Sequence, residues 1–320
     1  MSGTRVPLLF GTMTMGDEGA SGVRNWDLVE CADILAVFAS HGTEIDTARM
    51  YGEGTTEKLL SKLDLANFSV DTKVYPAKPG DHSAAVLRST FFASLEALNR
   101  KKVRVLYLHA PDRSVPFEET LEEMNRLYIE GYYEIFGLSN FASWEVAEVV
   151  SICKGKGWIQ PKIYQAMYNA ITRAIESELV PCCRKFGIRI VVYNPLAGGL
   201  FAGKLSSASD APTTGRFTTA TAAGRMYRER YLKNGNFDAL NHLKEIAAQH
   251  NLRLTEIALR WCQHHSVLCE QDGVILGASS ADQLKQNCED SGKGPLPNAI
   301  VAAIDEAWEI SRGTASTYWR

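Results

Sequence analysis

The amino-acid sequence predicts an α/β fold, a (β/α)8 barrel of the TIM type. Eight short apolar runs alternate with longer amphipathic segments, which is typical of a parallel sheet covered by helices. The chain of 320 residues is long enough for eight such units. An open doubly wound sheet would carry GxGxxG after its first strand, but this chain reads Gly11-Thr12-Met13-Thr14-Met15-Gly16 there. We therefore expect residues 1–320 to form a single barrel domain.

The expected strands are short runs rich in Val, Ile, Leu and Tyr, and most of them end at a polar residue. In chain order they are Val6–Met13, Glu44–Thr47, Val70–Val74, Val103–His109, Glu134–Ser139, Ile163–Tyr168, Ile188–Tyr193 and Gly273–Leu276. The expected helices are amphipathic segments that lie between or after these strands. They are Asp27–Ala39, Ser83–Leu98, Phe117–Glu130, Trp144–Cys153 with Ser143 as its N-cap, Ile175–Phe186, Phe237–Gln249 and Ala281–Asn287.

Two regions exceed the repeating unit. Residues 202–235 are rich in Gly, Ser, Thr and Ala and then become basic, which predicts a long functional loop after the seventh strand. The C-terminal region adds a helix, Asn298–Ile310, and a tail that ends in Tyr318-Trp319-Arg320.

Composition excludes several classes of function. The net charge is −3, so no basic field favours nucleic acid. No apolar run approaches the ~18 residues of a membrane span, and the N-terminus lacks the pattern of a signal peptide. The seven cysteines are odd in number and form no CxxC pair, which favours reduced thiols in the cytoplasm. We expect a cytoplasmic protein that binds neither nucleic acid, nor membrane, nor metal.

Polar residues gather where the strands of such a barrel would end, which is where barrel enzymes place their chemistry. Asp46 and Tyr51 follow strand two, Lys73 lies in strand three and His109 ends strand four. Taken singly, each has an ordinary explanation as a helix cap, a packed ring, a solvated charge or a structural histidine. Together they form a set, because a lysine inside a barrel needs a buried partner and Asp46 can supply it.

This set is suited to protonating a carbonyl oxygen. A free tyrosine has a pKa of about 10, and we expect the cation of the Lys73–Asp46 pair to lower the pKa of the Tyr51 phenol. A neutral His109 beside the phenol can donate a hydrogen bond to the same oxygen. The set would serve a reaction in which hydride arrives at the carbon as a proton reaches the oxygen.

At these residues the chain resembles the aldo-keto reductases, and the resemblance covers essentially the whole sequence. The motif residues that carry it are Gly42–Glu57, Thr72-Lys73-Val74, Leu108-His109, Phe136–Phe141 and Tyr164–Asn169. The run Tyr193–Leu200 is similar to the aflatoxin-aldehyde and succinic-semialdehyde reductase branch, as are Gly215-Arg216-Phe217, Tyr227–Arg230 and the arginine terminus.

The resemblance implies a role for each motif residue. Tyr51 would be the proton donor, supported by Lys73 and Asp46, with His109 orienting the carbonyl. Tyr193 would stack on the nicotinamide ring of NADPH (NADP+). The other residues implied to bind the cofactor are Ser139, Asn140, Gln165, Asn194, Pro195, Leu196, Gly198, Lys204, Arg216, Ser279, Gln283, Gln286 and Asn287. Those implied to bind the small carbonyl substrate are Met13, Tyr227, Arg230 and Arg320.

One departure from the family pattern concerns the cofactor. Many members carry an arginine that grips the adenosine 2′-phosphate, whereas the matching position here is the neutral Gln283. Arg216 or Lys285 could supply the cation, so NADPH remains the expected cofactor and tolerance of NADH stays open. The resemblance also implies a homodimer.

The leading prediction is an NADPH-dependent reductase of aldehydes, with ketones as further candidate substrates. Arg230 and Arg320 favour aldehydes with a distal carboxylate, and dialdehydes are a second class. Two alternatives stay open: a lyase that forms a Schiff base on Lys73, and a non-catalytic sensor that binds the cofactor, as in the potassium-channel β subunits of the same family.

Overall fold

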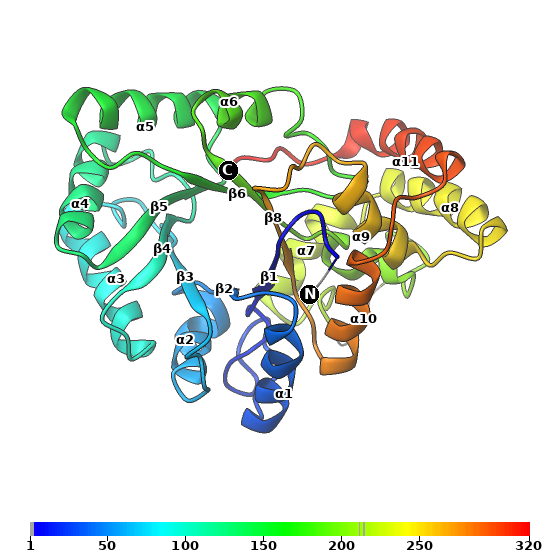
Figure 1. Ribbon diagram of the computed structural model, residues 1–320, viewed down its shortest axis with the longest axis horizontal. Coiled ribbons are helices and arrows are strands. Elements are labelled where there is room, and N and C mark those ends of the chain that lie inside the picture. Colours follow the sequence, from blue (N-terminus) through cyan, green and yellow to red (C-terminus); the bar gives the residue numbers. More distant parts are fainter. Residues whose placement is uncertain (1–2, 211, 214) are drawn as a thin grey trace.

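The computed structural model describes residues 3–210, 212–213 and 215–320, so positions 211 and 214 of the expected long loop lie outside the described residues. Eight parallel strands close into a barrel in chain order (Figure 1). They are β1 (Leu8–Gly11), β2 (Glu44–Asp46), β3 (Ser69–Val74), β4 (Val103–Leu108), β5 (Tyr133–Ser139), β6 (Ile163–Met167), β7 (Arg189–Tyr193) and β8 (Gly273–Leu276). The predicted (β/α)8 barrel is confirmed, and most strands end one or two residues from the predicted limits.

The register of the barrel brings the polar strand residues together. Asp46 of β2 lies opposite Gly11 of β1 and Asp71 of β3, and Lys73 lies opposite Tyr107 of β4. β1 also pairs with β8, which closes the barrel. Because alternate residues of a strand share a face, the carboxylate of Asp46 and the amine of Lys73 can enter the same interior layer.

The core has two parts. A small apolar cluster fills the inside of the barrel, and it includes Leu9, Val105, Ile163 and Val191. A much larger cluster lies between the outer face of the strands and the surrounding helices. Buried aliphatic residues on both faces of the strands are typical of parallel sheets, which explains why the sequence reads as short apolar runs.

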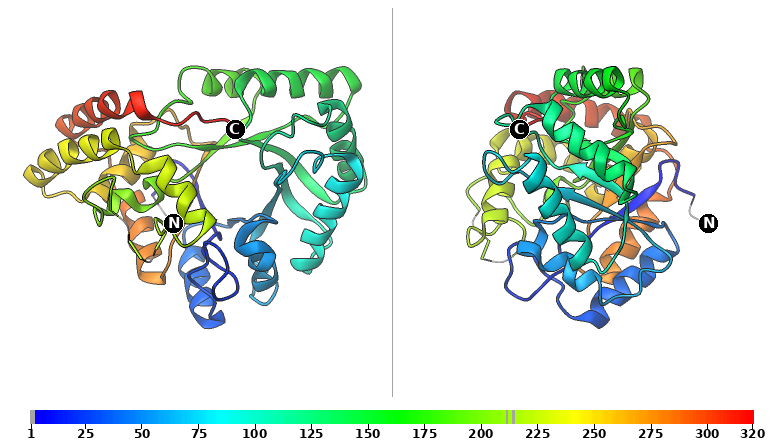
Figure 2. Two further views of the ribbon diagram at one scale, coloured as in Figure 1. Left: turned by 180° about the vertical axis from the view of Figure 1, so that it is seen from behind. Right: turned by 90° about the vertical axis from the view of Figure 1, so that its left-hand side faces the viewer.

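Helices surround the barrel, as the two further views in Figure 2 show. They are α1 (Leu28–Ala39), α2 (Thr55–Leu60), α3 (Ala84–Ala97), α4 (Phe117–Ile129), α5 (Ser143–Lys156), α6 (Leu179–Lys185), α7 (Ala222–Tyr231), α8 (Asn234–Gln249), α9 (Leu254–His264), α10 (Ala281–Ser291) and α11 (Asn298–Ser311). The expected segments are all helical at their centres. The helix expected at Ile175–Phe186 begins only at Leu179.

The N-cap predicted for α5 is wrong. Ser143 is the first helical residue, and Ala142 occupies the N-cap position. The Glu145 side chain accepts a hydrogen bond from the Ala142 N–H at 2.7 Å, while the Tyr318 hydroxyl accepts one from the Ser143 N–H at 3.0 Å. A residue from the far end of the chain thus satisfies a backbone donor that a local cap would otherwise hold.

The long segment after β7 is more ordered than a loop. It contains α7, whose buried residues Gly224, Tyr227 and Tyr231 lie at helical spacing. The prediction missed this helix because four of its other residues are charged and its apolar residues form no long run. It also missed α9, since α9 follows α8 without an intervening strand and the strand–helix count assigned one helix to that interval.

The C-terminal tail crosses the molecule from α11 toward the barrel strands. In Figure 1, α8 and α11 lie side by side and the chain end lies near β6. Lys233 holds the start of the tail by donating to the carbonyl oxygen of Thr314 at 2.7 Å and to the Ser316 hydroxyl at 3.0 Å. Among the described residues, no helix is long and apolar enough to cross a membrane.

Candidate active site

A cavity of about 500 Å³ opens at the C-terminal ends of the strands. Most of the residues singled out in the sequence line it. They are Met13, Asp46, Tyr51, His109, Asn140, Gln165, Tyr193, Asn194, Pro195, Leu196, Gly198, Arg216, Tyr227, Arg230, Ser279, Gln283, Asn287 and Arg320. Lys73 and Ser139 are fully buried, and neither lines the cavity. Lys204 is exposed, and Gln286 donates instead to Asp290 at 3.3 Å.

Lys73 links the buried carboxylate to the phenol at the base of this cavity. Its Nζ lies 2.7 Å from Asp46 Oδ2, 2.7 Å from the Thr47 carbonyl oxygen and 3.4 Å from Tyr51 Oη. The lysine has no exposed surface. An unpaired ammonium would be costly at this depth, so the pairing with Asp46 is what permits a cation here.

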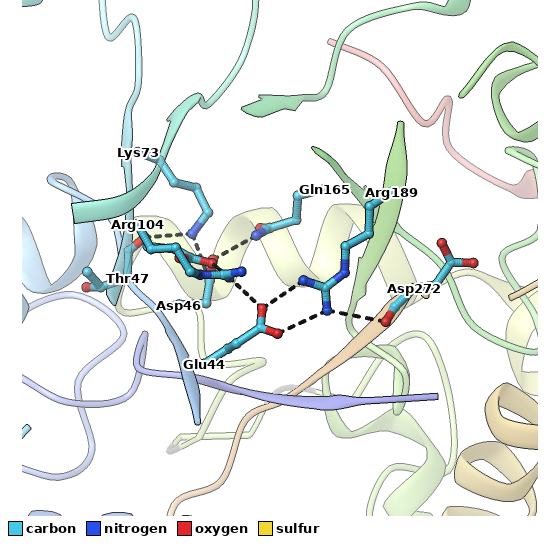
Figure 3. A network of polar contacts seen from close by, with 9 residues as sticks. Glu44, Asp46, Thr47, Lys73, Arg104, Gln165, Arg189 and Asp272 are labelled. Carbon is cyan, nitrogen blue, oxygen red and sulfur yellow. Dashed lines mark hydrogen bonds and ion pairs between the residues drawn. The ribbon is translucent and has the colours of Figure 1, made fainter. Parts of the chain in front are cut away.

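Asp46 is held on both carboxylate oxygens. Lys73 occupies Oδ2, and the side-chain amide of Gln165 donates to Oδ1 at 2.7 Å (Figure 3). Gln165 was expected to bind the nicotinamide. In this structure its Nε2 atom fixes the carboxylate that supports Lys73, a contact that could not be predicted from the sequence.

A tight turn places Tyr51. Gly52 and Gly54 have φ values of 54° and 92°, a backbone conformation that residues other than glycine rarely adopt. Behind the turn, Arg49 pairs with Glu57, and Glu57 also accepts a 2.6 Å hydrogen bond from Thr72 on β3. The phenol is therefore tied to the strand that carries Lys73.

His109 stands edge-on to two phenol rings. Its ring centroid lies 5.9 Å from that of Tyr51 and 5.4 Å from that of Tyr75. The Nδ1 atom is buried and has no hydrogen-bond partner within the described residues. Burial, and then the charge of Lys73, hold the pKa of His109 well below 6.5, so the imidazole is neutral and keeps one N–H to donate.

The expected effect of Lys73 on Tyr51 is wrong for this structure. Burial raises the pKa of the Tyr51 phenol well above 10, and the charge of Asp46 raises it further. Burial also lowers the pKa of Lys73. The physical reason is that Asp46, 2.7 Å from Lys73, offsets much of the lysine's charge, so desolvation outweighs the stabilisation that Lys73 gives to the phenolate.

Two asparagines shape the middle of the cavity. Asn140 has a φ of 61°; its amide donates to the His109 carbonyl oxygen at 2.7 Å, and its Oδ1 accepts from the Tyr193 hydroxyl at 3.2 Å. Asn194 accepts a hydrogen bond from Tyr227 at 3.2 Å, and its Nδ2 is buried.

The loop between β8 and α10 closes one side of the cavity. Ser280 caps α10, and Gln283 folds back so that its Oε1 accepts from the Ser279 N–H at 2.8 Å. Asn287, one turn further on, is only 4% exposed, and its Nδ2 has no partner within the described residues. A buried donor without a partner is uncommon in native structures, so this amide is a candidate for contacting a ligand.

The opposite side carries two arginines. The Arg230 guanidinium lies 5.8 Å from the centre of the Tyr227 ring. Arg320 is exposed at the cavity mouth, where its Nη2 contacts Met226 Sδ at 3.6 Å. Arg24 and Tyr75 also line the cavity and were missed, because both lie in loops whose sequence shows no periodicity.

The model of the Aldo/keto reductase family matches residues 7–309. The chain belongs to this family. It is 40% identical to human aldo-keto reductase family 7 member A3, over 100% of this chain and 99% of that protein. It is 42% identical to mouse aflatoxin B1 aldehyde reductase member 2, over 99% and 88%, and 39% identical to human aflatoxin B1 aldehyde reductase member 4, over 100% and 98%.

As an aldo/keto reductase, the protein is an oxidoreductase that acts on carbonyl compounds. The predicted resemblance, including the branch indicated by Tyr193–Leu200, is confirmed. The lyase alternative finds no support in the geometry, since a carbonyl substrate cannot reach a lysine with no exposed surface. Among the described residues, no group of three or more His, Cys, Asp or Glu side chains could hold a metal ion.

A second polar network lies below the reductase site, toward the N-terminal ends of the strands. Figure 3 shows Glu44 between two arginines: Arg104 approaches its carboxylate to 2.5 Å and Arg189 to 2.9 Å. Arg104 also pairs with the buried Asp71. Polar residues at this end of a barrel support the fold rather than the chemistry, which leaves Asp46 and Lys73 as the deepest charges of the site.

Proposed function

We propose that this aldo/keto reductase reduces aldehydes to alcohols with NADPH, with Tyr51 as the proton donor. The observation that carries the proposal is the position of Lys73 Nζ, 2.7 Å from Asp46 and 3.4 Å from the Tyr51 hydroxyl. The protonated phenol of Tyr51 thus lies beside Lys73 at the base of the cavity, next to the neutral His109.

The donors that line the cavity fit a nicotinamide dinucleotide. Asn287 presents a buried amide nitrogen that has no partner in the described chain, and Tyr193 offers an aromatic ring whose hydroxyl donates to Asn140. Arg216 adds a guanidinium in the same cavity. When bound, the cofactor supplies a hydride to the carbonyl carbon. We assign Asn194, Asn287, Tyr193 and Arg216 the role of holding the nucleotide in the cavity.

The proton comes from Tyr51. Because its pKa is raised, the phenol keeps its proton until negative charge develops on the substrate oxygen. Lys73 then stabilises the phenolate at 3.4 Å, and Asp46 with Gln165 holds Lys73 in place. Neutral His109 donates a hydrogen bond to the same oxygen and fixes the face of the carbonyl.

Substrates with a distal carboxylate suit the mouth of the cavity. Arg230 and Arg320 present guanidinium groups there, and a carboxylate can accept two hydrogen bonds from one such group. The names of the mouse and human relatives state that they reduce aflatoxin B1 aldehyde. Because of the two arginines, we propose aldehydes with a distal carboxylate as the preferred substrates and dialdehydes as the second class.

The test is NADPH oxidation across matched carbonyl compounds. We expect turnover with succinic semialdehyde and 2-carboxybenzaldehyde, slower turnover with neutral aldehydes of the same size, and the least with simple ketones. Protein that binds NADPH tightly but turns over none of them would overturn the proposal in favour of the sensor alternative.

A further inference from the structure

Arg24 is a cation without an assigned role. It lies in the loop between β1 and α1 and lines the same cavity as Arg216. The Arg24 Nη2 atom lies 3.7 Å from the point at which a Cβ on Gly215 would stand, so it approaches the backbone next to Arg216. Two guanidinium groups from distant parts of the chain therefore meet at one wall.

Neither arginine has a carboxylate partner within the described residues. Within the described residues, the contacts of Arg216 are with the Tyr227 hydroxyl, at 3.4 Å, and with the face of its ring, at 5.0 Å between the guanidinium carbon and the centroid. Burial and then the nearby charge of Arg216 lower the pKa of Arg24 to about 10. Two adjacent and partly buried cations repel each other, so an anion bound to both would stabilise the pair.

The loop that carries Arg24 is fastened to the loop that begins α10. Thr14 accepts the Arg24 N–H at 2.7 Å and donates its hydroxyl to the Ala278 carbonyl oxygen at 2.8 Å. Asn25 donates to the Ser279 carbonyl oxygen at 3.0 Å. These hydrogen bonds hold Arg24 against the segment that contains Ser279 and Gln283, so its position is built into the fold.

The same wall offers neutral donors to an anion. Gln283 uses its Oε1 to hold Ser279, and its Nε2 makes no hydrogen bond within the described residues. The Arg216 Nη2 lies 4.0 Å from where a Cβ on Gly277 would stand, so glycine leaves room beside the guanidinium. The buried Nδ2 of Asn287 lines this cavity without a partner.

We propose that Arg24 and Arg216 form a two-guanidinium site for the 2′-phosphate of the cofactor, which makes Arg24 a determinant of the preference for NADPH over NADH. The inference rests on the proposed function. A phosphate monoester carries close to two negative charges on one phosphorus and so balances both cations, whereas each phosphorus of a pyrophosphate bridge carries only one. Arg24 thereby supplies the charge that neutral Gln283 lacks.

Of the two cations that the sequence offered for the 2′-phosphate, Arg216 lines the cavity and Lys285 does not. Lys285 lies two residues after Gln283 on α10, and it is exposed and does not line the cavity. Residues two apart on a helix do not share a face. Lys285 is therefore a matched control: it is a surface cation of the same helix whose loss removes one charge without touching the site.

The experiment is calorimetric titration of the unliganded protein with NADPH, NADH, 2′-AMP and 5′-AMP. Arg24→Gln should raise the Kd for NADPH and 2′-AMP about tenfold, the loss of one charge-assisted bond. The Kd for NADH and 5′-AMP should stay within about twofold of the wild type, and Lys285→Gln should change none of the four. Arg24→Gln that leaves NADPH binding unchanged, or that weakens NADPH and NADH equally, would overturn the inference.

Thermal unfolding of the variant and cofactor binding by the wild type provide two further tests. Without nucleotide, Arg24→Gln should unfold at the same or a higher temperature than the wild type, because repulsion between two cations is removed. A lower unfolding temperature together with equal losses for all nucleotides would assign Arg24 a structural role and contradict the site. Wild-type protein that binds neither NADPH nor NADH would overturn the proposed function itself, and this inference with it.

Discussion

The backbone N–H of Arg320 donates a hydrogen bond of 3.0 Å to the carbonyl oxygen of Asn140. The last residue of the chain is thus attached to a residue of the cavity wall. Tyr318 anchors the tail further back, where its hydroxyl contacts Glu178 and the Ser143 N–H. The Trp319 ring lies 5.7 Å from the Arg113 guanidinium. A terminal residue is usually frayed, but these contacts hold Arg320 over the mouth of the site.

Arg320→Ala should raise KM for succinic semialdehyde by roughly tenfold, because one charge-assisted hydrogen bond is lost and water partly replaces it. The KM of a neutral aldehyde of similar size should hardly change. Steady-state kinetics on both substrates measure the difference. Arg312→Ala is the control, since Arg312 is an exposed arginine that pairs with Glu309 outside the cavity. Equal losses for both substrates would show that the tail is only structural.

Lys73→Met should lower kcat by about a hundredfold or more, the usual range for loss of acid–base assistance. It should also cost about 3–5 kcal/mol of stability, because Asp46 is left as an unpaired buried charge. The double variant Lys73→Met with Asp46→Leu removes both charges and should regain much of that stability while staying inactive. Denaturant unfolding and turnover distinguish the two effects. A single variant with normal turnover contradicts the assignment.

Stability should fall on the acid side of pH 6.5. The pKa of folded His109 lies well below 6.5, and that of buried His82 is also lowered. Below pH 6.5 the unfolded chain therefore binds protons that the folded chain does not, and stability is lost as the pH falls toward the folded pKa values.

Thermal unfolding of the wild type and His109→Gln across this pH range measures that loss. The variant should show a shallower fall of Tm below pH 6.5, while exposed His250→Gln should behave like the wild type. Parallel profiles for wild type and His109→Gln would show that the pKa of His109 is not lowered by folding, which would contradict the assignment of a permanently neutral imidazole.

Much of this structure could be predicted because its determinants are local. Each barrel strand is a short apolar run, and the polar residue at its end marks the side of the chemistry, so Asp46, Tyr51 and His109 were found together. The depth of Lys73 also followed from the sequence, since a lysine inside a barrel requires a partner.

The features that were missed depend on contacts between distant parts of the chain. The role of Gln165 in holding Asp46 spans 119 positions. The role proposed for Arg24 depends on its proximity to Arg216 and to the loop at Ser279. Tyr318, from the far end of the chain, takes the place of a local cap at Ser143. The pKa of Tyr51 was misjudged because charge balance around Lys73 depends on burial, which spacing alone does not reveal.

Tyr51→Phe tests the central claim most directly, since it removes the transferable proton and keeps the ring. Single-turnover reduction of 2-carboxybenzaldehyde by the NADPH-loaded variant should be slower by at least about a hundredfold. NADPH affinity should stay within about twofold of the wild type, because the phenol is not among the proposed cofactor ligands. A hydride-transfer rate within about tenfold of the wild type would contradict the account and remove Tyr51 as the proton donor.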